Sequence, residues 1–229
     1  RGASEDYTID YNSAEIIFDE LSIQSKWVNA RADGQAKLVG IQKGWPTAIL
    51  GQLTFTNIFA NPKNLYAEPI ELEGASVDLK LQMDPFRLKL GEMTLRDQGQ
   101  VLAVSGDLHA KEDGWDLTLS GRMQALSPER LLMLWPKSLG IKTRDWIENN
   151  ILTGKLKNIQ LGLRSLPTQR PDFYLGFDFD ELDTLFMKTM PPIQNAAGHA
   201  SLFKDRFSVT AEKGTVTAAQ GGAIDITGT

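Results

Sequence analysis

The chain of 229 residues contains no cysteine, and this absence excludes disulfides, thiolate metal sites and cysteine nucleophiles. It suits the reducing cytosol and equally an oxidising bacterial periplasm, where free thiols are a liability. The sequence also lacks the ~18–20 consecutive apolar residues of a membrane-spanning helix, and it shows no signal peptide. Because it opens on Arg1 and closes on what reads as an unfinished strand at 223–227, we expect a fragment of a larger protein.

Basic residues are neither in excess nor clustered: 24 Lys and Arg stand against 29 Asp and Glu, for a net charge of −5. A nucleic-acid-binding surface needs a basic stripe to neutralise phosphates, so we predict no nucleic-acid partner. Hydrophobic content of 41% and charged content of 23% are typical of a folded protein. The chain is long enough to form a hydrophobic core that is stable without disulfides or a bound metal ion.

Alternation of apolar and polar residues with period two is the dominant pattern. In the clearest run, 75–83, every odd-numbered residue is apolar, beginning with the small Ala75, and every even-numbered residue is polar. Asp84-Pro85 marks a turn, and alternation resumes at Phe86 and again after polar turns at 97–100 and 111–114. Residues 74–123 are therefore predicted to form four antiparallel strands with one apolar and one solvated face.

Further strands are predicted on both sides of this region. The earlier segments alternate less cleanly, and the strand at 156–163 shows an irregularity near Asn158. Turns are predicted at Lys204-Asp205, Lys213-Gly214 and Gly221-Gly222. The remaining predicted strands are 9–11, 15–23, 36–41, 48–58, 173–179, 200–204, 207–211, 215–218 and 224–227.

One segment breaks the β pattern. Ser127-Pro128-Glu129 is a helix start, with an N-cap serine, a proline at the first helical position and an acid in the first turn. Thr143 is predicted to cap a second short helix that ends before Gly154. The chain then divides into a β region at 1–126, a helical insert at 127–153 and a continuing β region at 154–229. The predicted fold is mainly β, a curved antiparallel sheet that is taco-shaped, half-barrel or sandwich-like, with this helical pair inserted.

The acidic cluster at Asp178, Asp180, Glu181 and Asp183 is the strongest candidate for chemistry. A calcium loop needs an oxygen ligand at its fifth position and glycine at its sixth, and Leu182 and Asp183 stand there instead. Asp178 and Asp180 share a strand face, as a glycoside hydrolase pair could, but many surface strands have this spacing. A solvated strand face that runs into a turn is the preferred interpretation.

Other catalytic patterns fail on geometry or spacing. Ser201 and Lys204 have the bare Ser-x-x-Lys spacing of penicillin-binding enzymes, but in a strand they would lie on opposite faces. His109 and His199 are isolated, with no spacing typical of a zinc site. We therefore predict no catalytic residue, no metal site and no cofactor.

The helical insert and its flanks carry a resemblance to a known family. Leu131–Pro136 and then Thr143–Asn150 contain a Trp-Pro followed by an Arg-x-Trp-Ile block, and Gly154–Ile159 continues as a strand. This arrangement is similar to the central region of bacterial AsmA-like proteins of the YhdP type, which are related to TamB. A later stretch, 191–198 followed by Asp205-Arg206-Phe207, also resembles that family. The resemblance covers roughly residues 120–215.

The resemblance implies a module of a large periplasmic protein with an inner-membrane anchor outside this fragment. It implies a taco-shaped sheet around an apolar trough, a phospholipid or other acyl lipid as partner, a possible association with envelope proteins, and a role in phospholipid transport between the two membranes or in outer-membrane integrity. The family supplies no catalytic residues to carry over.

The apolar face fits two architectures equally well, a closed sandwich core and an open groove. Under the groove hypothesis, Trp135 and Trp146 lie on helices that cap or gate one end. The predicted lining consists of Val77, Leu79, Leu81, Phe86, Leu88, Leu90, Trp115, Leu117 and Leu119. The alternatives are a closed β-sandwich acting as a structural or protein-interaction module and, less favoured, a glycan-processing enzyme using Asp178 and Asp180.

Overall fold

The computed structural model describes residues 13–61, 65–66, 68–186, 189–218 and 220–227. They form twelve strands and two helices. The elements are β1 (Ser13–Gln24), β2 (Val28–Gln42), β3 (Trp45–Ala60), β4 (Ile70–Gln82), β5 (Arg87–Asp97), β6 (Gln100–Lys111), β7 (Gly114–Leu126), α1 (Pro128–Leu134), α2 (Ile141–Asn150), β8 (Ile151–Ser165), β9 (Asp172–Thr184), β10 (Ile193–Phe203), β11 (Arg206–Thr217) and β12 (Ala223–Asp225).

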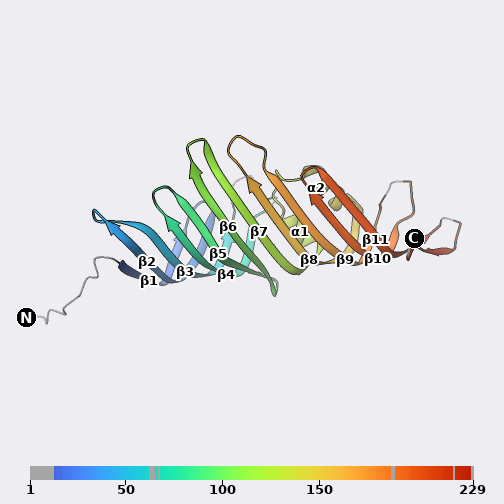
Figure 1. Cartoon of the computed structure of the whole chain (residues 1–229). Helices are drawn as coiled ribbons and strands as arrows, with labels where there is room; N and C mark the ends of the chain where they lie inside the picture. The colour runs from blue at the N-terminus through green and yellow to red at the C-terminus, as the bar shows by residue number, and fades with distance from the viewer. Residues whose placement is uncertain (1–12, 62–64, 67, 187–188, 219, 228–229) are drawn as a thin grey trace, which may run out of the picture.

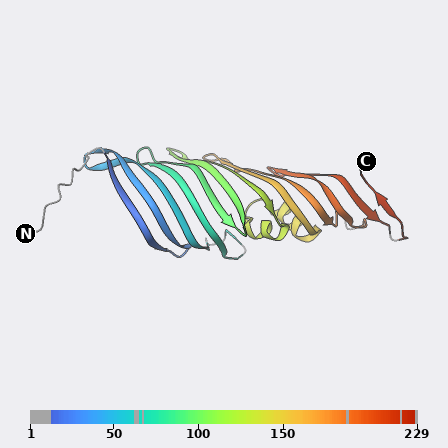
Figure 2. The same ribbon diagram turned by 90° about the horizontal axis from the view of Figure 1, so that it is seen from below.

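All twelve strands belong to one antiparallel sheet, in which each strand pairs with its neighbours in the sequence. About 70% of the described residues are in strands, and the sheet is not closed into a barrel. Figures 1 and 2 show the strands succeeding one another along the long axis of a bent sheet, with the helices near the middle. The predicted fold class is confirmed, and within the described ranges there is no second sheet to complete a sandwich.

Several predicted details are confirmed, and some are corrected. The four-stranded region at 74–123 corresponds to β4–β7, with turns where they were predicted. The predicted break at Lys213-Gly214 is wrong, because β11 runs through both residues. Gly214 has φ +159°, which is extended backbone, and Ile193 packs where its side chain would be. The strand predicted at 9–11 lies outside the described residues.

The helical pair begins where the sequence indicates. The Ser127 hydroxyl accepts a hydrogen bond from the Arg130 amide at 3.2 Å, as expected of an N-cap. The predicted cap at Thr143 is wrong: Gly140, in the left-handed conformation, starts α2 and Thr143 is buried inside the helix. Gly154 lies in β8, because the chain returns to extended backbone at Ile151.

Register shifts mark bulges in several strands, β5 and β11 among them. Five other bulged strands each have a non-glycine residue at positive φ, between +47° and +51°, where the chain carries one extra residue against a neighbouring strand. These residues are Glu20, Asn57, Asn158, Glu181 and Asn195. At each bulge two inward-facing apolar residues are three positions apart instead of two. The irregularity predicted near Asn158 is confirmed, and it recurs across the sheet.

The main core lies between the helical pair and the C-terminal half of the sheet. Its helical side is formed by Leu131, Trp135 and Ile147, all at most 7% exposed. Its sheet side is formed by Met123, Leu156, Ile159, Leu175, Phe177, Phe179, Leu182, Ala196, Ala200 and Leu202. A smaller cluster around Ala30, Ile58 and Ala75 lies on the N-terminal half. The helices therefore cover only part of the apolar face.

Candidate functional site

One face of the sheet is apolar over nearly its whole length, because the register aligns apolar residues strand after strand. Directly paired residues in an antiparallel sheet point to the same side. One row across the sheet is Ile49, Leu81, Leu88, Leu108 and Leu117. The adjacent row is Gly51, Leu79, Leu90, Gly106, Leu119 and Leu163. We call this side of β3–β7 the open apolar face.

The predicted groove lining maps onto this face. Val77 belongs to the next row along, and the leucines predicted in β4, β5 and β7 all lie in the two rows above. Phe86 lies in the turn between β4 and β5, where its ring meets the Trp115 ring edge-on at 5.5 Å between centroids. Trp115, at the start of β7, is 53% exposed. These two aromatic residues therefore mark one rim of the face.

Exposure distinguishes the two halves of the apolar side. Under the helices the inward side chains are buried, for example Leu175 at 3% and Leu202 at 1%. On the open apolar face the leucines of both rows are only half-buried. Leu119 and Leu163 line a space below α1, and no described helix covers the others. This contrast leaves a strip of hydrocarbon in contact with solvent.

Glycines let the leucines of this side lie flat. A side chain at Gly121 would come within 2.9 Å of the Leu161 side chain, and one at Gly51 within 3.2 Å of Leu79. Leu119 likewise lies over Gly106. Because these leucines fold down onto bare backbone, they keep the space above the sheet free of protein side chains.

The helical pair encloses two apolar cavities against the sheet. The first, the α1 cavity, has a volume of about 280 Å³ and lies between β6–β9 and the segment from α1 to Leu139. Leu119, a residue of the open apolar face, lines it, so the two are contiguous. Tyr66 is among its lining residues, and burial raises the pKa of the Tyr66 phenol.

The second cavity, the α2 cavity, has a volume of about 160 Å³ and lies between both helices and β8–β11. Leu131 of α1 lines both cavities and stands between them.

The two tryptophans predicted to cap the groove each border one cavity. Trp135 follows α1 as its C-cap residue, lines the α1 cavity, and donates its indole N–H to the Leu139 carbonyl at 2.7 Å. Trp146 lies in α2, lines the α2 cavity, and contacts the Phe207 ring at 5.3 Å between centroids. The structure thus places both of them beside apolar space.

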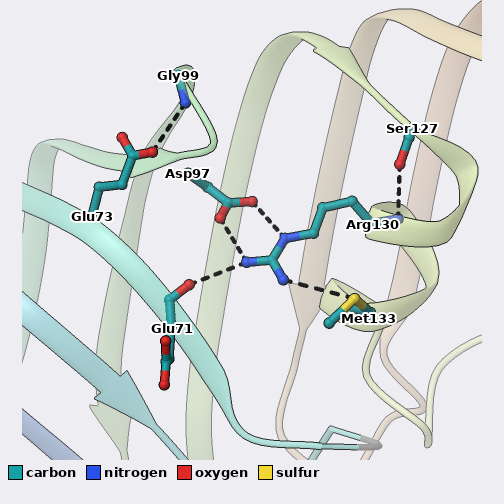
Figure 3. A network of polar contacts seen from close by, with 7 residues as sticks. All are labelled: Glu71, Glu73, Asp97, Gly99, Ser127, Arg130 and Met133. Carbon is teal, nitrogen blue, oxygen red and sulfur yellow. Dashed lines mark hydrogen bonds and ion pairs between the residues drawn. The ribbon is translucent and has the colours of Figure 1, made fainter.

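A buried ion pair holds α1 against the sheet (Figure 3). Two nitrogens of the Arg130 guanidinium donate to the two oxygens of Asp97 at 2.6 and 2.7 Å, and one also donates to the Glu71 carbonyl at 3.1 Å. The side chains of Arg130 and Asp97 are 9% and 5% exposed. The hydrogen bond from Arg130 to Asp97 raises the pKa of the guanidinium, so it stays charged. Sequence reasoning missed this pair, because its members are 33 residues apart and belong to no motif.

The acidic cluster lies on the opposite, polar face. Asp178 accepts a hydrogen bond from the Asn158 amide at 2.7 Å, and Asp180 pairs with Lys157 at 3.0 Å. The hydrogen bond from Lys157 lowers the pKa of Asp180. Both carboxylates are thus engaged with neighbouring strands in an ordinary cross-strand network.

The other candidates for chemistry remain apart. His199 pairs with Glu212 on the polar face, and Lys204 pairs with Asp172 at the turn after β10. Within the described part of the chain, no three His, Cys, Asp or Glu side chains come together in a way that could hold a metal ion. No helix among the described residues is both long and apolar enough to cross a membrane.

Comparisons with known proteins add no relative: no family model, no curated protein and no solved structure matches this chain.

Proposed function

We propose that this chain is a non-enzymatic lipid-binding module whose open apolar face receives acyl chains. The observation that carries the proposal is the pair of half-buried leucine rows, uncovered over β3–β7 and contiguous with the α1 cavity through Leu119. Water contact with so much hydrocarbon is unfavourable, and a second hydrocarbon surface removes it.

The energetics suit a carrier. Each methylene group that leaves water gains about 0.8 kcal/mol, so a long acyl chain held in water costs on the order of 10 kcal/mol. A continuous apolar strip lowers that barrier without any chemical step. Because hydrophobic contact is non-directional, the strip would accept many lipids. The polar opposite face, with ion pairs such as that of Lys157 and Asp180, would remain in water.

The wider role follows from the resemblance to AsmA-like envelope proteins of the YhdP type. On that basis we propose a periplasmic location, a parent protein anchored in the inner membrane, and phospholipid transport between the membranes or maintenance of the outer membrane. The Trp-Pro and Arg-x-Trp segments that carry the resemblance form the helical pair beside both cavities.

Native mass spectrometry of the purified chain tests the lipid-binding proposal. Leu79→Asp places a charge in the middle of the open apolar face, and Lys80→Asp places the same charge on the polar face of the same strand. We expect phospholipid to co-purify with the unaltered chain and with Lys80→Asp, and to be lost from Leu79→Asp. Because Leu79 is only half-buried, the aspartate reaches water and the sheet still folds. Absence of lipid from the unaltered chain, or equal lipid in both variants, would refute the proposal.

A further inference from the structure

The α2 cavity is long and narrow. Along β9 its lining runs from Phe177, which pairs with Ala200, to Thr184, which pairs with Ile193. At about 3.3 Å per residue, with one residue taken up by the bulge at Glu181, this lining is about 20 Å long. One tail of a bilayer lipid spans about half of the ~30 Å hydrocarbon core. The cavity is as long as such a tail, but its volume of about 160 Å³ limits an occupant to a shorter chain.

A single hydroxyl interrupts this apolar lining. Thr184 is 5% exposed, and its Oγ1 has no hydrogen-bond partner among the described residues. A buried hydroxyl without a partner is unfavourable, and nearly all such groups in folded proteins are satisfied. The other lining residues that the structure describes are apolar, so a molecule in the cavity would supply the missing partner.

The cavity opens to the surface near this hydroxyl. Phe186, two residues after Thr184, lines the cavity and is 44% exposed. Its ring lies 6.4 Å from that of Trp146, on the facing helix. The two rings are in contact and form an apolar rim at this end, while Leu131 separates the cavity from the α1 cavity and so from the open apolar face.

We propose that the α2 cavity is a separate site for one short acyl group, whose carboxyl or ester oxygen accepts a hydrogen bond from the Thr184 hydroxyl. The tail would lie along β9 from Thr184 in the direction of Phe177. The volume sets the chain length, since a cavity of about 150 Å³ holds benzene and 160 Å³ is therefore room for about six carbon atoms. This inference depends on the proposed function, because it names a ligand class for the same apolar side.

Photo-crosslinking with hexanoic acid that carries a diazirine at its tail end tests the site. We expect labelled peptides from β9 and β10. We expect Ala196→Leu, which fills the cavity beside Leu182, two residues of β9 from Thr184, to lower that labelling at least tenfold. His199→Leu adds a similar side chain on the polar face of the same strand and should leave labelling unchanged. Should Ala196→Leu fail to fold, Ala211→Leu fills the same cavity from the half-buried strand β11.

Thr184→Val isolates the hydrogen bond. It removes the hydroxyl at constant shape, so the chain should unfold at an unchanged or higher urea concentration while its affinity for hexanoate falls about fivefold, the effect of one neutral hydrogen bond. A purely structural threonine would not lose affinity while the fold kept its stability. Unchanged affinity would overturn the assignment of Thr184.

A long-chain diazirine fatty acid separates this inference from the proposed function. If it labels β4–β7 while hexanoate labels nothing in the α2 cavity, the separate site is wrong and the open-face carrier stands. If neither probe labels the chain and no lipid co-purifies, both proposals fail.

Discussion

Removal of the Asp97 carboxylate is the sharpest test of how α1 is held against the sheet. Asp97→Ala leaves the Arg130 guanidinium with two of the contacts drawn in Figure 3, to the Glu71 carbonyl and, at 3.8 Å, to the Met133 sulfur. The two side chains are 9% and 5% exposed, so water cannot replace the lost carboxylate without displacing the helix. Breaking one side of a buried ion pair costs about 3–5 kcal/mol. We expect a loss of that size in the free energy of unfolding.

Urea unfolding followed by circular dichroism measures this loss, and the chain offers a matched control. Arg87 and Asp107 form the same type of two-point pair, but their side chains are 50% and 28% exposed. Asp107→Ala should therefore have a much smaller effect, because solvent screens an exposed pair. If both substitutions destabilise equally, the pair beneath α1 is not buried and the reasoning fails.

A double substitution separates the ion pair from the packing. Asp97→Leu combined with Arg130→Met replaces both charges with apolar groups of similar size, and such replacements are often neutral or stabilising. We expect it to recover most of the stability that Asp97→Ala loses. If the double variant is as unstable as the single one, the arginine acts through its other hydrogen bonds and not through its charge.

Two further predictions concern local features. Ser127→Ala removes the α1 N-cap hydroxyl, which accepts a hydrogen bond from the Arg130 amide, and should lower the free energy of unfolding in urea by about 1 kcal/mol. Ser138→Ala, at an exposed position, should leave it almost unchanged. Equal effects of the two substitutions would contradict the N-cap assignment. Acidification below about pH 4 should lower the free energy of unfolding, because hydrogen bonds from Lys157 and Lys111 lower the pKa values of Asp180 and Asp116 in the folded chain. A carboxyl group whose pKa is lowered by folding stabilises the fold above its unfolded-state pKa, and this stabilisation is lost as the pH falls through its folded-state pKa. A double Asp→Asn variant at these positions should lose less stability between neutral and acid pH, and an unchanged pH dependence would contradict this account.

Strand alternation predicted the open apolar face because a period of two fixes which side each residue faces. Between Val77 and Leu81 no bulge intervenes, so counting by two along the sequence gives the correct face. It could not show where the helices pack. Leu175 and Leu119 both alternate, yet the first is buried under the helical pair and the second is half-buried.

The incorrect predictions concern residue types that occur in more than one kind of local structure. Glycine ends many strands, and Lys213-Gly214 looked like a turn; in β11 this glycine instead gives room to Ile193 of β10 and to Ile226, which follows β12. Thr143 resembles a helix cap, but a left-handed Gly140 begins the helix three residues earlier. Nothing in the sequence singles out Thr184, because a hydroxyl at the end of a strand is common. It becomes unusual only when it is buried, and its burial depends on the position of α2, which the sequence does not predict.

The less regular alternation of the early segments has the same cause as the bend of the sheet. In β1 the inward residues Phe18 and Leu21 are three positions apart, with Glu20 at φ +47° between them. Leu156 and Ile159 repeat this spacing in β8, around Asn158 at φ +51°. An apolar pair with spacing three inside a strand of spacing two, with Asn, Asp or Glu between, therefore marks a bulge.

Substitutions at Asn158 test this interpretation of the bulges. Asn158→Gly loses the hydrogen bond to Asp178 but adopts the left-handed conformation freely, whereas Asn158→Val loses the same bond and is β-branched. The difference in unfolding free energy between the two variants, measured in urea, should be about 1–2 kcal/mol in favour of glycine. Gln160→Val, at an exposed position of the same strand without positive φ, should show no such loss, since valine favours extended backbone. Equal stability of Asn158→Gly and Asn158→Val would mean that β8 straightens without penalty, and the bulge would then no longer explain why the apolar side curves around the space above it.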